Sequence, residues 1–300
     1  MTNRVDGDGL GRRALPAQLS SNGVAIPFDD EHFVPMLDST PLLGDPAALR
    51  DRFAADGYVL LRAVLDPTTV RELRGRYFRR FDRAILADGT SPEDGIFSGC
   101  VPPRLPDYGT SGHPAHAFVR SAEFQAFTAS PVLRGVAEQL LDASVELVPR
   151  RIVRHFHRLS GRASRAHVDY DYMDQGGDEL VTEWIPLGDC PIETGGLIYL
   201  EGSHRVPRAR LDALRQHTDR PDDRRPVSND LALTARTLGG RWLWTDYAAG
   251  DVVVHSPHTV HASLDNATER MRLSADIRFR RVDSAPDARW SGAWSADDGF

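Results

Sequence analysis

The stretch RAHVDYDYM, residues 165–173, places one histidine and two carboxylates at alternating positions, His167, Asp169 and Asp171. In a β-strand, side chains two residues apart point to the same face, so this spacing would align all three groups. His167 and Asp169 would lie about 7 Å apart along the backbone, close enough to hold one metal ion, whereas Asp171 would lie roughly 13 Å from His167. The spacing predicts His167 and Asp169 as metal ligands and Asp171 as a hydrogen-bonding group at the rim.

A third ligand has to come from another segment of the chain. The stretch GDVVVHSPHTVHASLDN supplies His255, His258 and His261, and spacing alone leaves the choice among them open. Two imidazoles and one carboxylate on one side of an ion leave positions for O2 and a co-substrate, which is typical of non-haem Fe(II) oxygenases. A zinc hydrolase can use the same three ligand types. An HxD pair can also arise by chance and serve only the structure.

The composition excludes several classes of enzyme. The sequence contains no lysine, so all 36 basic residues are arginine. Schiff-base catalysis, pyridoxal phosphate attachment and the P-loop each need a lysine amine. A formal charge of -7 argues against a general nucleic-acid or anionic-membrane binder. No apolar run is long enough to cross a bilayer, the N-terminus does not read as a signal peptide, and the two cysteines form no CxxC pair, so we expect a cytoplasmic protein.

The pattern along the chain changes from helices to strands. Two capped helices are expected, one from Asp45 to Gly57 and one from Asp66 to about Gly89, followed by one or two more within 120–142. From Val145 onward, short alternating segments separated by Gly and Pro predict an antiparallel β-core. We therefore expect one domain, 1–300, mainly β with flanking helices. Its parts are an N-terminal extension (1–45), a helical support (46–142), a β-core (145–282) with an insertion near 205–230, and a tail (283–300).

Two segments stand out from this pattern by their composition. Residues 91–117 form a long connection rich in Pro and Gly, and residues 205–230 form a polar stretch inside the strand series. Loops of such length in a compact domain are usually binding loops, lids or disordered segments. We expect these two segments to determine specificity.

Several ordered motifs together resemble the phytanoyl-CoA dioxygenase family of Fe(II)/2-oxoglutarate oxygenases. They are HVDYDYM, WIPLGDCPIETGGLIYLEGSHR, and AGDVVVHSPHTVHASLDN leading to RMRLS, which span about 165–280. FAADGYVLLRAVLDPTTV near the N-terminus adds support. The resemblance implies a double-stranded β-helix, or jelly-roll, core with the N-terminal helices packed on it. It also implies that Fe(II) and 2-oxoglutarate are the cofactor and co-substrate.

The resemblance also selects the third ligand. In this family the distal histidine is followed eleven residues later by the arginine that pairs with the C5 carboxylate of 2-oxoglutarate. That step leads from His261 to Arg272, so the resemblance implies His261 as the ligand and Arg272 as the co-substrate anchor. A guanidinium suits this task because it offers a fixed, two-pronged cation to a carboxylate. The family pattern further implies that Ser263 and Trp184 line the co-substrate pocket, with Ser274 as another hydroxyl there.

The sequence gives weaker indications that other polar residues belong to the site. Arg154 and Arg158 lie just before the HxD stretch and could meet an anionic group of the substrate or co-substrate, although a solvated strand edge explains such arginines equally well. His155 and His157 have no carboxylate at matching spacing, so we expect pocket or surface roles. His255 and His258 flank Pro257 and are expected to be core groups or to support the ligands. The sequence thus proposes Arg154, Arg158, Asp171 and His255 as residues around the site.

The expected activity is hydroxylation of an unactivated C–H bond in a small molecule, with O2 as the oxidant, in bacterial specialised-metabolite biosynthesis. Relatives that halogenate replace the carboxylate ligand with a small residue, so Asp169 opposes halogenation. Desaturation, epimerisation and ring formation stay open. The alternatives are a zinc hydrolase and a non-catalytic binding protein of the same fold. The sequence predicts no nucleic-acid partner and no membrane partner, and it does not indicate the oligomeric state.

Overall fold

The computed structural model describes residues 15–173, 178–215 and 225–296. A large sheet has the strand order β4 (Tyr58–Leu61), β10 (Val252–His255), β7 (Leu180–Pro186), β12 (Arg272–Arg281) and β5 (Val145–Leu147). β6 (Ile152–Phe156) pairs with the first half of β12, antiparallel like every other pair in this sheet. A smaller sheet has the order β11 (His261–Ser263), β8 (Leu197–Leu200), β9 (Trp242–Trp244) and β3 (Phe33–Pro35).

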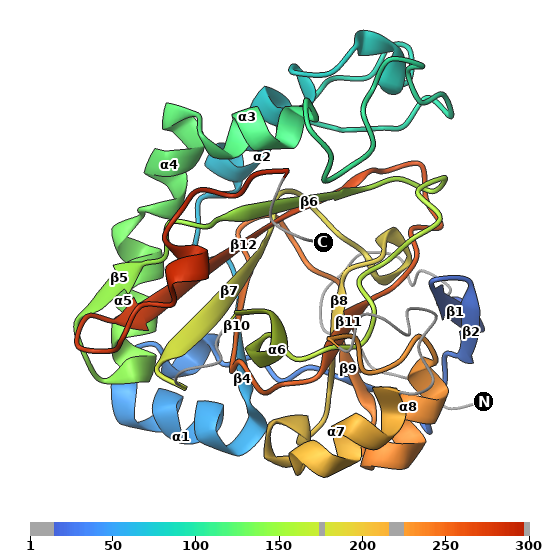
Figure 1. Cartoon of the computed structure of the whole chain (residues 1–300). Coiled ribbons are helices and arrows are strands. Elements are labelled where there is room, and N and C mark those ends of the chain that lie inside the picture. The colour runs from blue at the N-terminus through green and yellow to red at the C-terminus, as the bar shows by residue number, and fades with distance from the viewer. Residues whose placement is uncertain (1–14, 174–177, 216–224, 297–300) are drawn as a thin grey trace.

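The two sheets enclose a common interior, which Figure 1 shows between β7 and β12 on one side and β8 and β11 on the other. Trp184 and Val253 of the large sheet and Leu197, Tyr199 and Leu243 of the smaller sheet pack there in one apolar cluster. Alternation along each strand sends these residues inward and their neighbours outward. The predicted jelly-roll core is confirmed.

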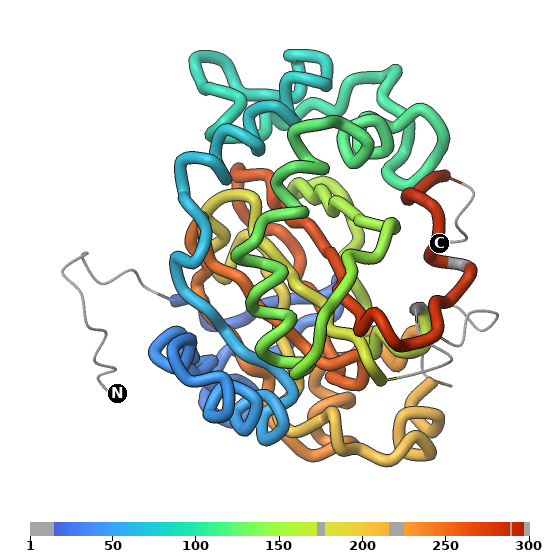
Figure 2. Tube along the Cα trace, turned by 90° about the vertical axis from the view of Figure 1, so that its left-hand side faces the viewer, coloured from blue at the N-terminus to red at the C-terminus, as the bar shows by residue number. Residues whose placement is uncertain are grey.

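Helices from the N-terminal half cover the outer face of the large sheet. They are α1 (Pro46–Asp56), α2 (Pro67–Phe78), α3 (Pro114–Val119), α4 (Ala122–Thr128) and α5 (Pro131–Leu141). Figure 2 shows them in front of the strands. Apolar residues of α2 and α5, such as Val70 and Leu133, share one core with the outward-facing Val181 and Ile277 of the sheet. Two further helices, α7 (Arg208–Leu214) and α8 (Leu231–Leu238), lie beside the smaller sheet.

The predicted helix boundaries hold in part. Asp45 caps α1 by accepting a hydrogen bond from the backbone of Ala48, and Gly57 ends it with φ 75°. The helix predicted from Asp66 to Gly89 instead ends at Phe78. The predicted helix was too long because Asp82 caps a separate 3-10 turn, Arg83–Ile85. A polar side chain that caps a new turn competes with continuation of the helix.

The described part of the N-terminal extension contains a hairpin and a further strand that were not predicted. β1 (Gln18–Ser21) and β2 (Val24–Pro27) form a hairpin, and β3 adds to the smaller sheet in parallel with β9. Asn22 and Gly23 both have positive φ, 51° and 77°, as a two-residue hairpin turn requires. The Asn-Gly pair was the available signal in the sequence.

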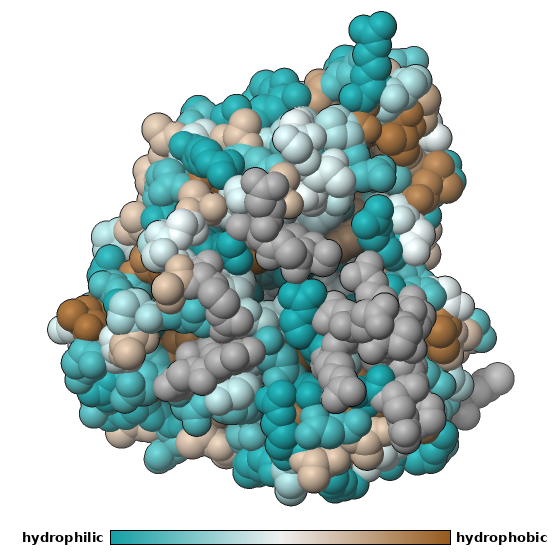
Figure 3. Space-filling model, viewed as in Figure 1, coloured by the Kyte–Doolittle hydropathy of each residue, from teal (hydrophilic) through white to brown (hydrophobic). Residues whose placement is uncertain are grey.

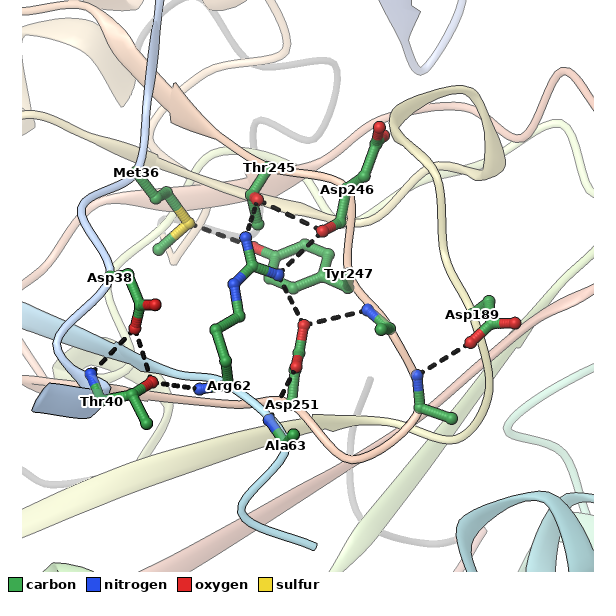
Figure 4. A network of polar contacts seen from close by, with 12 residues as sticks. Met36, Asp38, Thr40, Arg62, Ala63, Asp189, Thr245, Asp246, Tyr247 and Asp251 are labelled. Carbon is green, nitrogen blue, oxygen red and sulfur yellow. Dashed lines mark hydrogen bonds and ion pairs between the residues drawn. The ribbon is translucent and has the colours of Figure 1, made fainter. Parts of the chain in front are cut away.

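A polar network joins β4 to the loop that follows β9. The Arg62 guanidinium donates to the carboxylate of Asp251 at 2.6 Å, and it also bonds to Thr245 and to the backbone of Asp246. Figure 4 shows Arg62 lying between Thr245 and Asp251, with Tyr247 behind it. Asp251 is 2% exposed and also accepts from the backbone of Ala63 and Ala248. The network therefore ties the two sheets together without exposing the buried carboxylate.

Candidate active site

Two histidines and one carboxylate meet between the two sheets. Nε2 of His167 and Nε2 of His261 each lie 3.6 Å from Oδ1 of Asp169. All three residues are buried, and one ligand atom from each lies within 4.8 Å of the others. Within the described ranges, no other group of three such side chains meets this geometry. The structure thus brings together the three residues that the sequence analysis proposed as ligands.

The backbone aligns the two histidines. His167 and His261 pair through two hydrogen bonds of 3.0 Å, one in each direction, so His167 lies beside the first residue of β11. The pairing places the two imidazole centroids 4.2 Å apart. The prediction of a continuous strand through residues 166–173 is wrong. The backbone of Tyr170 donates to the carbonyl of Pro257, and the chain turns into a short helix, α6 (Tyr170–Met173).

This turn removes Asp171 from the face that His167 and Asp169 were predicted to share. The Asp171 carboxylate instead pairs with Arg208 and Arg215, at the two ends of α7. It does not line the cavity described below, although it is buried and hydrogen-bonded. His167 and Asp169 are therefore brought together by a turn that follows two isolated β-bridges, at Ala166 and His167, and a continuous strand has no part in it.

Hydrogen bonds to the backbone orient both imidazoles. Nδ1 of His167 lies 2.7 Å from the carbonyl of Arg165, and Nδ1 of His261 lies 2.9 Å from the carbonyl of Thr259. A carbonyl only accepts, so each Nδ1 carries the proton and each Nε2 presents its lone pair. Two lone pairs and a carboxylate oxygen then converge with no proton between them, an arrangement that a bound cation would complete.

The second oxygen of Asp169 has its own partners. Thr182 donates to Oδ2 at 2.6 Å, Arg278 donates to it at 3.2 Å, and Nε2 of His255 lies 3.4 Å away. Burial alone would raise the pKa of Asp169, but the Arg278 guanidinium and the neighbouring histidines hold that pKa well below its usual range. These contacts leave Oδ1 facing the two Nε2 atoms.

The pKa of His261 is held well below its usual value, first by burial and then by His167 and His255. The imidazole is therefore neutral near pH 7, as a metal ligand must be. Two imidazoles and one ionised carboxylate are ligands of the type that non-haem iron binds. The residues present fit a divalent iron ion.

Arg272 begins β12 and is 1% exposed. Its Nη1 donates to the carbonyl of Gly195 and its Nη2 to the hydroxyl of Ser274, both at 3.1 Å. Its guanidinium also lies over two aromatic rings, those of Phe156 at 5.0 Å and Trp184 at 5.6 Å. Burial lowers the pKa of Arg272, and no described carboxylate forms an ion pair with it. A buried cation of this kind fits an anionic co-substrate.

The other residues predicted for the co-substrate pocket are all fully buried. Ser274 accepts from Arg272, while the hydroxyl of Ser263 accepts from the backbone of Ser164 at 2.7 Å and fastens the loop before His167. Trp184 packs edge-on against Tyr247 at 4.7 Å and supports the Arg272 guanidinium from the inner face of β7.

A cavity of about 710 Å³ opens beside His167 and Asp169. Its walls include Tyr108–Ser111 of the long loop, the strand residues Ile152 and Arg154, and Trp290 near the C-terminus. A smaller pocket lies next to this cavity and shares Arg154 and Arg278 with it. Its other lining residues include the third ligand, His261, and four residues near the ligands: Thr182, Leu197, His255 and Asp276. Figure 3 shows a hollow near the middle of the face seen in Figure 1, with hydrophilic residues below it.

The residues predicted around the site divide between the cavity and the surface. Arg154 lines both pockets and pairs with Asp276 at 2.6 Å, and His255 lines the inner pocket. Arg158 lies outside both and pairs with Glu269, half-exposed, because it follows the end of β6. His258 was expected to be a core or supporting group but contacts Asp178 near the surface.

The remaining histidines have structural contacts. His155 points to the helix side of β6, where its ring packs against Tyr77 and Phe81. His157 stacks on Phe97 with centroids 4.4 Å apart. His204 lies 3.1 Å from the carbonyl of Ala54. None of the three histidines lies in the His–Asp–His cluster. The expectation of a pocket or surface role is wrong for His155, because its side chain faces the helix side of the sheet and is buried among aromatic rings.

Sequence reasoning missed two partners of Asp169, which are Thr182 and Arg278. A signal was present in both strands. The stretch RLSADIR places Arg272, Ser274, Asp276 and Arg278 at alternating positions of β12, and thus on one face. Thr182 likewise shares the face of Trp184 and lies opposite Arg278 in the strand pairing.

The sequence profile of the phytanoyl-CoA dioxygenase family matches residues 53–274. The chain belongs to this family. A curated relative, the 1-deoxypentalenic acid 11-beta-hydroxylase of Streptomyces exfoliatus, is 24% identical over 262 residues, which are 83% of this chain and 86% of the relative. Its counterpart from Streptomyces arenae is 26% identical over 258 residues, or 82% of this chain and 85% of the relative.

Several solved structures share this fold. The epimerase SnoN, in complex with Fe3+, alpha ketoglutarate and nogalamycin RO, is similar with a TM-score of 0.56 and 23% identity, covering 81% of this chain and 87% of SnoN. The carbocyclase SnoK from nogalamycin biosynthesis has a TM-score of 0.55 and 20% identity, covering 82% and 86%. EvdO2 from Micromonospora carbonacea var. aurantiaca, complexed with 2-oxoglutarate, has a TM-score of 0.51 and 23% identity, covering 85% and 97%.

The family match and the His–Asp–His geometry confirm three expectations from the sequence. The chain is an enzyme of the dioxygenase family, its fold is the jelly roll, and it uses iron and 2-oxoglutarate. In the described part of the chain, no helix has the length and apolar character to span a membrane.

Proposed function

We propose that the protein is an Fe(II)- and 2-oxoglutarate-dependent dioxygenase that hydroxylates an unactivated C–H bond of a small molecule in specialised-metabolite biosynthesis. The convergence of His167, Asp169 and His261 in the interior carries this proposal. Both curated relatives are named hydroxylases of 1-deoxypentalenic acid, and the similar structures SnoN and SnoK come from nogalamycin biosynthesis, which supports the reaction and the setting.

The residues of the site would hold the metal, orient its carboxylate ligand and bind the co-substrate. His167, Asp169 and His261 would hold the iron from one side, and Thr182 and Arg278 keep Oδ1 of Asp169 directed at it. When bound, iron with 2-oxoglutarate supplies the activation of O2 needed to oxidise a C–H bond. Arg272 would bind the C5 carboxylate of 2-oxoglutarate, since it is a buried cation with no described anionic partner.

Asp169 favours hydroxylation over halogenation. Its carboxylate points Oδ1 at both imidazoles and would occupy the coordination position that a halide needs. Arg272 favours an oxygenase over a zinc hydrolase, because hydrolysis by a metal-bound water gives no role to a buried guanidinium that has no ion-pair partner among the described residues. Epimerisation and ring formation use the same residues, so only product analysis distinguishes them from hydroxylation.

Anaerobic titration of the purified protein with Fe(II) and 2-oxoglutarate tests the proposal. A weak visible absorption band should develop only when both are present, and exposure to O2 should release succinate. Asp169→Ala and His261→Ala should abolish the band, whereas His204→Ala, which changes a histidine outside the site, should retain it. Zn(II)-dependent hydrolysis without any response to 2-oxoglutarate would contradict the proposal.

A further inference from the structure

Arg278 is a buried cation in direct contact with a proposed metal ligand. It lies on β12 opposite Thr182 of β7, and both side chains donate to Oδ2 of Asp169, at 3.2 Å and 2.6 Å. The guanidinium is 3% exposed, and Asp169 is its only ion-pair partner among the described residues. A metal ion bound to Oδ1 would therefore share its single carboxylate ligand with a second cation.

Neither stability nor the orientation of Asp169 accounts for an arginine at this position. Nε and Nη1 of Arg278 are buried and have no hydrogen-bond partner among the described residues. Buried polar groups without partners destabilise a fold. Orientation of the carboxylate requires one donor to Oδ2, and Thr182 supplies it at the shorter distance. The property that Arg278 adds, and that Thr182 lacks, is a positive charge.

This charge changes the balance of the pocket around the ligands. Apart from the histidines, the titratable side chains that line the smaller pocket are two arginines and two aspartates: Arg154, Arg278, Asp169 and Asp276. Arg154 pairs with Asp276 at 2.6 Å, and Arg278 pairs with Asp169. Without Arg278, the pocket would attract a metal ion with one net negative charge. With Arg278, these four charges cancel, and the attraction is weaker for every cation.

The effect of Arg278 increases with the charge of the metal ion. The ring centre of Trp290 lies 5.7 Å from the guanidinium carbon of Arg278, and Asp169 is as buried as the arginine, so water and salt screen these charges little. At an effective dielectric constant of about 20, two unit charges about 7 Å apart interact strongly enough to change an equilibrium more than tenfold. Fe(III) carries one charge more than Fe(II), so Arg278 opposes binding of the ferric ion more.

We propose that Arg278 sets the oxidation-state preference of the iron site. Its charge, placed on the outer oxygen of Asp169, disfavours Fe(III) relative to Fe(II) and keeps the bound iron in the ferrous state. Arg278 acts through Asp169 and is not itself a ligand. The inference rests on the proposed function, because that function assigns Fe(II) to this site. It explains why a strand residue with unpaired N–H groups stands beside a ligand that Thr182 already orients.

An anaerobic redox titration of the iron-loaded protein tests this proposal. The amount of Fe(III) is followed by electron paramagnetic resonance at a series of fixed potentials, without 2-oxoglutarate. Arg278→Gln should raise the affinity for Fe(III) relative to Fe(II) at least tenfold, which lowers the midpoint potential by about 59 mV or more for one electron. Arg278→Lys retains the charge and should stay near the parent potential. An unchanged potential in Arg278→Gln would overturn the proposal.

Thr182→Val is the matched control, because it removes the other hydrogen bond to Oδ2 and changes no charge. It should weaken the binding of Fe(II) and Fe(III) alike and leave the midpoint potential near the parent value. An equal fall in Thr182→Val and Arg278→Gln would assign the effect to the orientation of Asp169 and overturn the proposal. If Arg278→Gln folds poorly, Arg278→Met replaces the arginine with a long side chain that needs no hydrogen bonds, and it should show the same fall in potential.

The failure of the proposed function gives a different result. A protein that takes up no iron would show no ferric signal at any potential, in the parent or in the variants. In that case, competition for Zn(II) against a chelating dye still decides the inference. Arg278→Gln should then bind Zn(II) more tightly than Arg278→Lys, because only the lysine retains a charge that repels the ion. Equal affinities of the two variants for Zn(II) would overturn the inference.

Discussion

Thr182 donates a 2.6 Å hydrogen bond to Oδ2 of Asp169, and this contact keeps the other oxygen directed at the two imidazoles. Thr182 projects from the inner face of the central strand β7, whereas Asp169 lies in an irregular segment between a β-bridge and α6. A rigid strand thus fixes the orientation of a ligand that has no regular structure of its own. Hydrogen bonds of this kind to a metal ligand have a large effect on the affinity of the site for its metal.

Loss of the Thr182 hydroxyl should weaken metal binding. Thr182→Val keeps the shape of the side chain, so the expected result is an Fe(II) dissociation constant roughly 10- to 100-fold higher. Anaerobic titration with Fe(II), or with Co(II) as a spectroscopic substitute, measures it. Thr182→Ser retains the hydroxyl and should bind metal nearly as the parent does. Unchanged affinity in the valine variant would show that Arg278 alone is sufficient to orient Asp169.

Arg272→Gln should affect the co-substrate and spare the metal. Removal of a buried cation from a carboxylate partner typically costs several kcal/mol, so the KM for 2-oxoglutarate should rise about 100-fold. Fe(II) affinity measured without 2-oxoglutarate should stay within about twofold of the parent value, since Arg272 makes no described contact with the three ligands. Arg241→Gln, which changes an exposed arginine paired with Glu201, is the control. An unchanged KM would assign the C5 carboxylate to another arginine.

Glu183 should destabilise the fold increasingly as the pH rises. The side chain is 0% exposed, and neither carboxylate oxygen has a hydrogen-bond partner. It faces the helix side of β7, where its neighbours Val181 and Ile185 belong to the apolar core. Burial raises the pKa of Glu183 well above its usual value of 4.5. The folded chain therefore keeps the proton above pH 4.5, whereas the unfolded chain releases it.

This difference sets the sign of the pH dependence. The contribution of Glu183 to stability is fully present below about pH 4.5 and is lost as the pH rises toward the raised pKa. Glu183→Gln removes the titration, so its stability gain over the parent should grow between pH 5 and 7. Glu183→Leu also removes the unpaired oxygens and should add about 1 to 3 kcal/mol. Urea unfolding at several pH values measures both effects, and a gain independent of pH would contradict the raised pKa.

Gly57→Ala should disturb both the fold and the metal site. Gly57 ends α1 with φ 75°, and an added Cβ would collide with the ring of His204 and lie 2.8 Å from the hydroxyl of Thr259. The carbonyl of Thr259 orients the His261 imidazole, so a shift there reaches a ligand. We expect a loss of about 1 to 3 kcal/mol in the free energy of unfolding and weaker Fe(II) binding. Gly44→Ala is the control, because nothing lies within 4 Å of its added Cβ.

The sequence by itself determined the fold class and the identities of the proposed ligands. The order of helices followed by alternating strands predicted a β-core with flanking helices, residue spacing pointed to His167 and Asp169, and the resemblance to a known family selected His261 and Arg272. These predictions depend on residue type and on separation along the chain, which are properties of the sequence. They did not require knowledge of which strands pair.

The tertiary structure alone decided how the site is supported. Pairing of β7 with β12 places Thr182 opposite Arg278, so residues almost one hundred positions apart hold one carboxylate oxygen. The turn that carries Asp171 away from the site depends on a backbone bond to Pro257 and on arginines of α7, both distant in sequence. Likewise, Arg162 and Arg225 line one cavity only because two separate loops meet there. Such contacts depend on the packing of segments that are distant in sequence, and the spacing of residues within one segment cannot predict that packing.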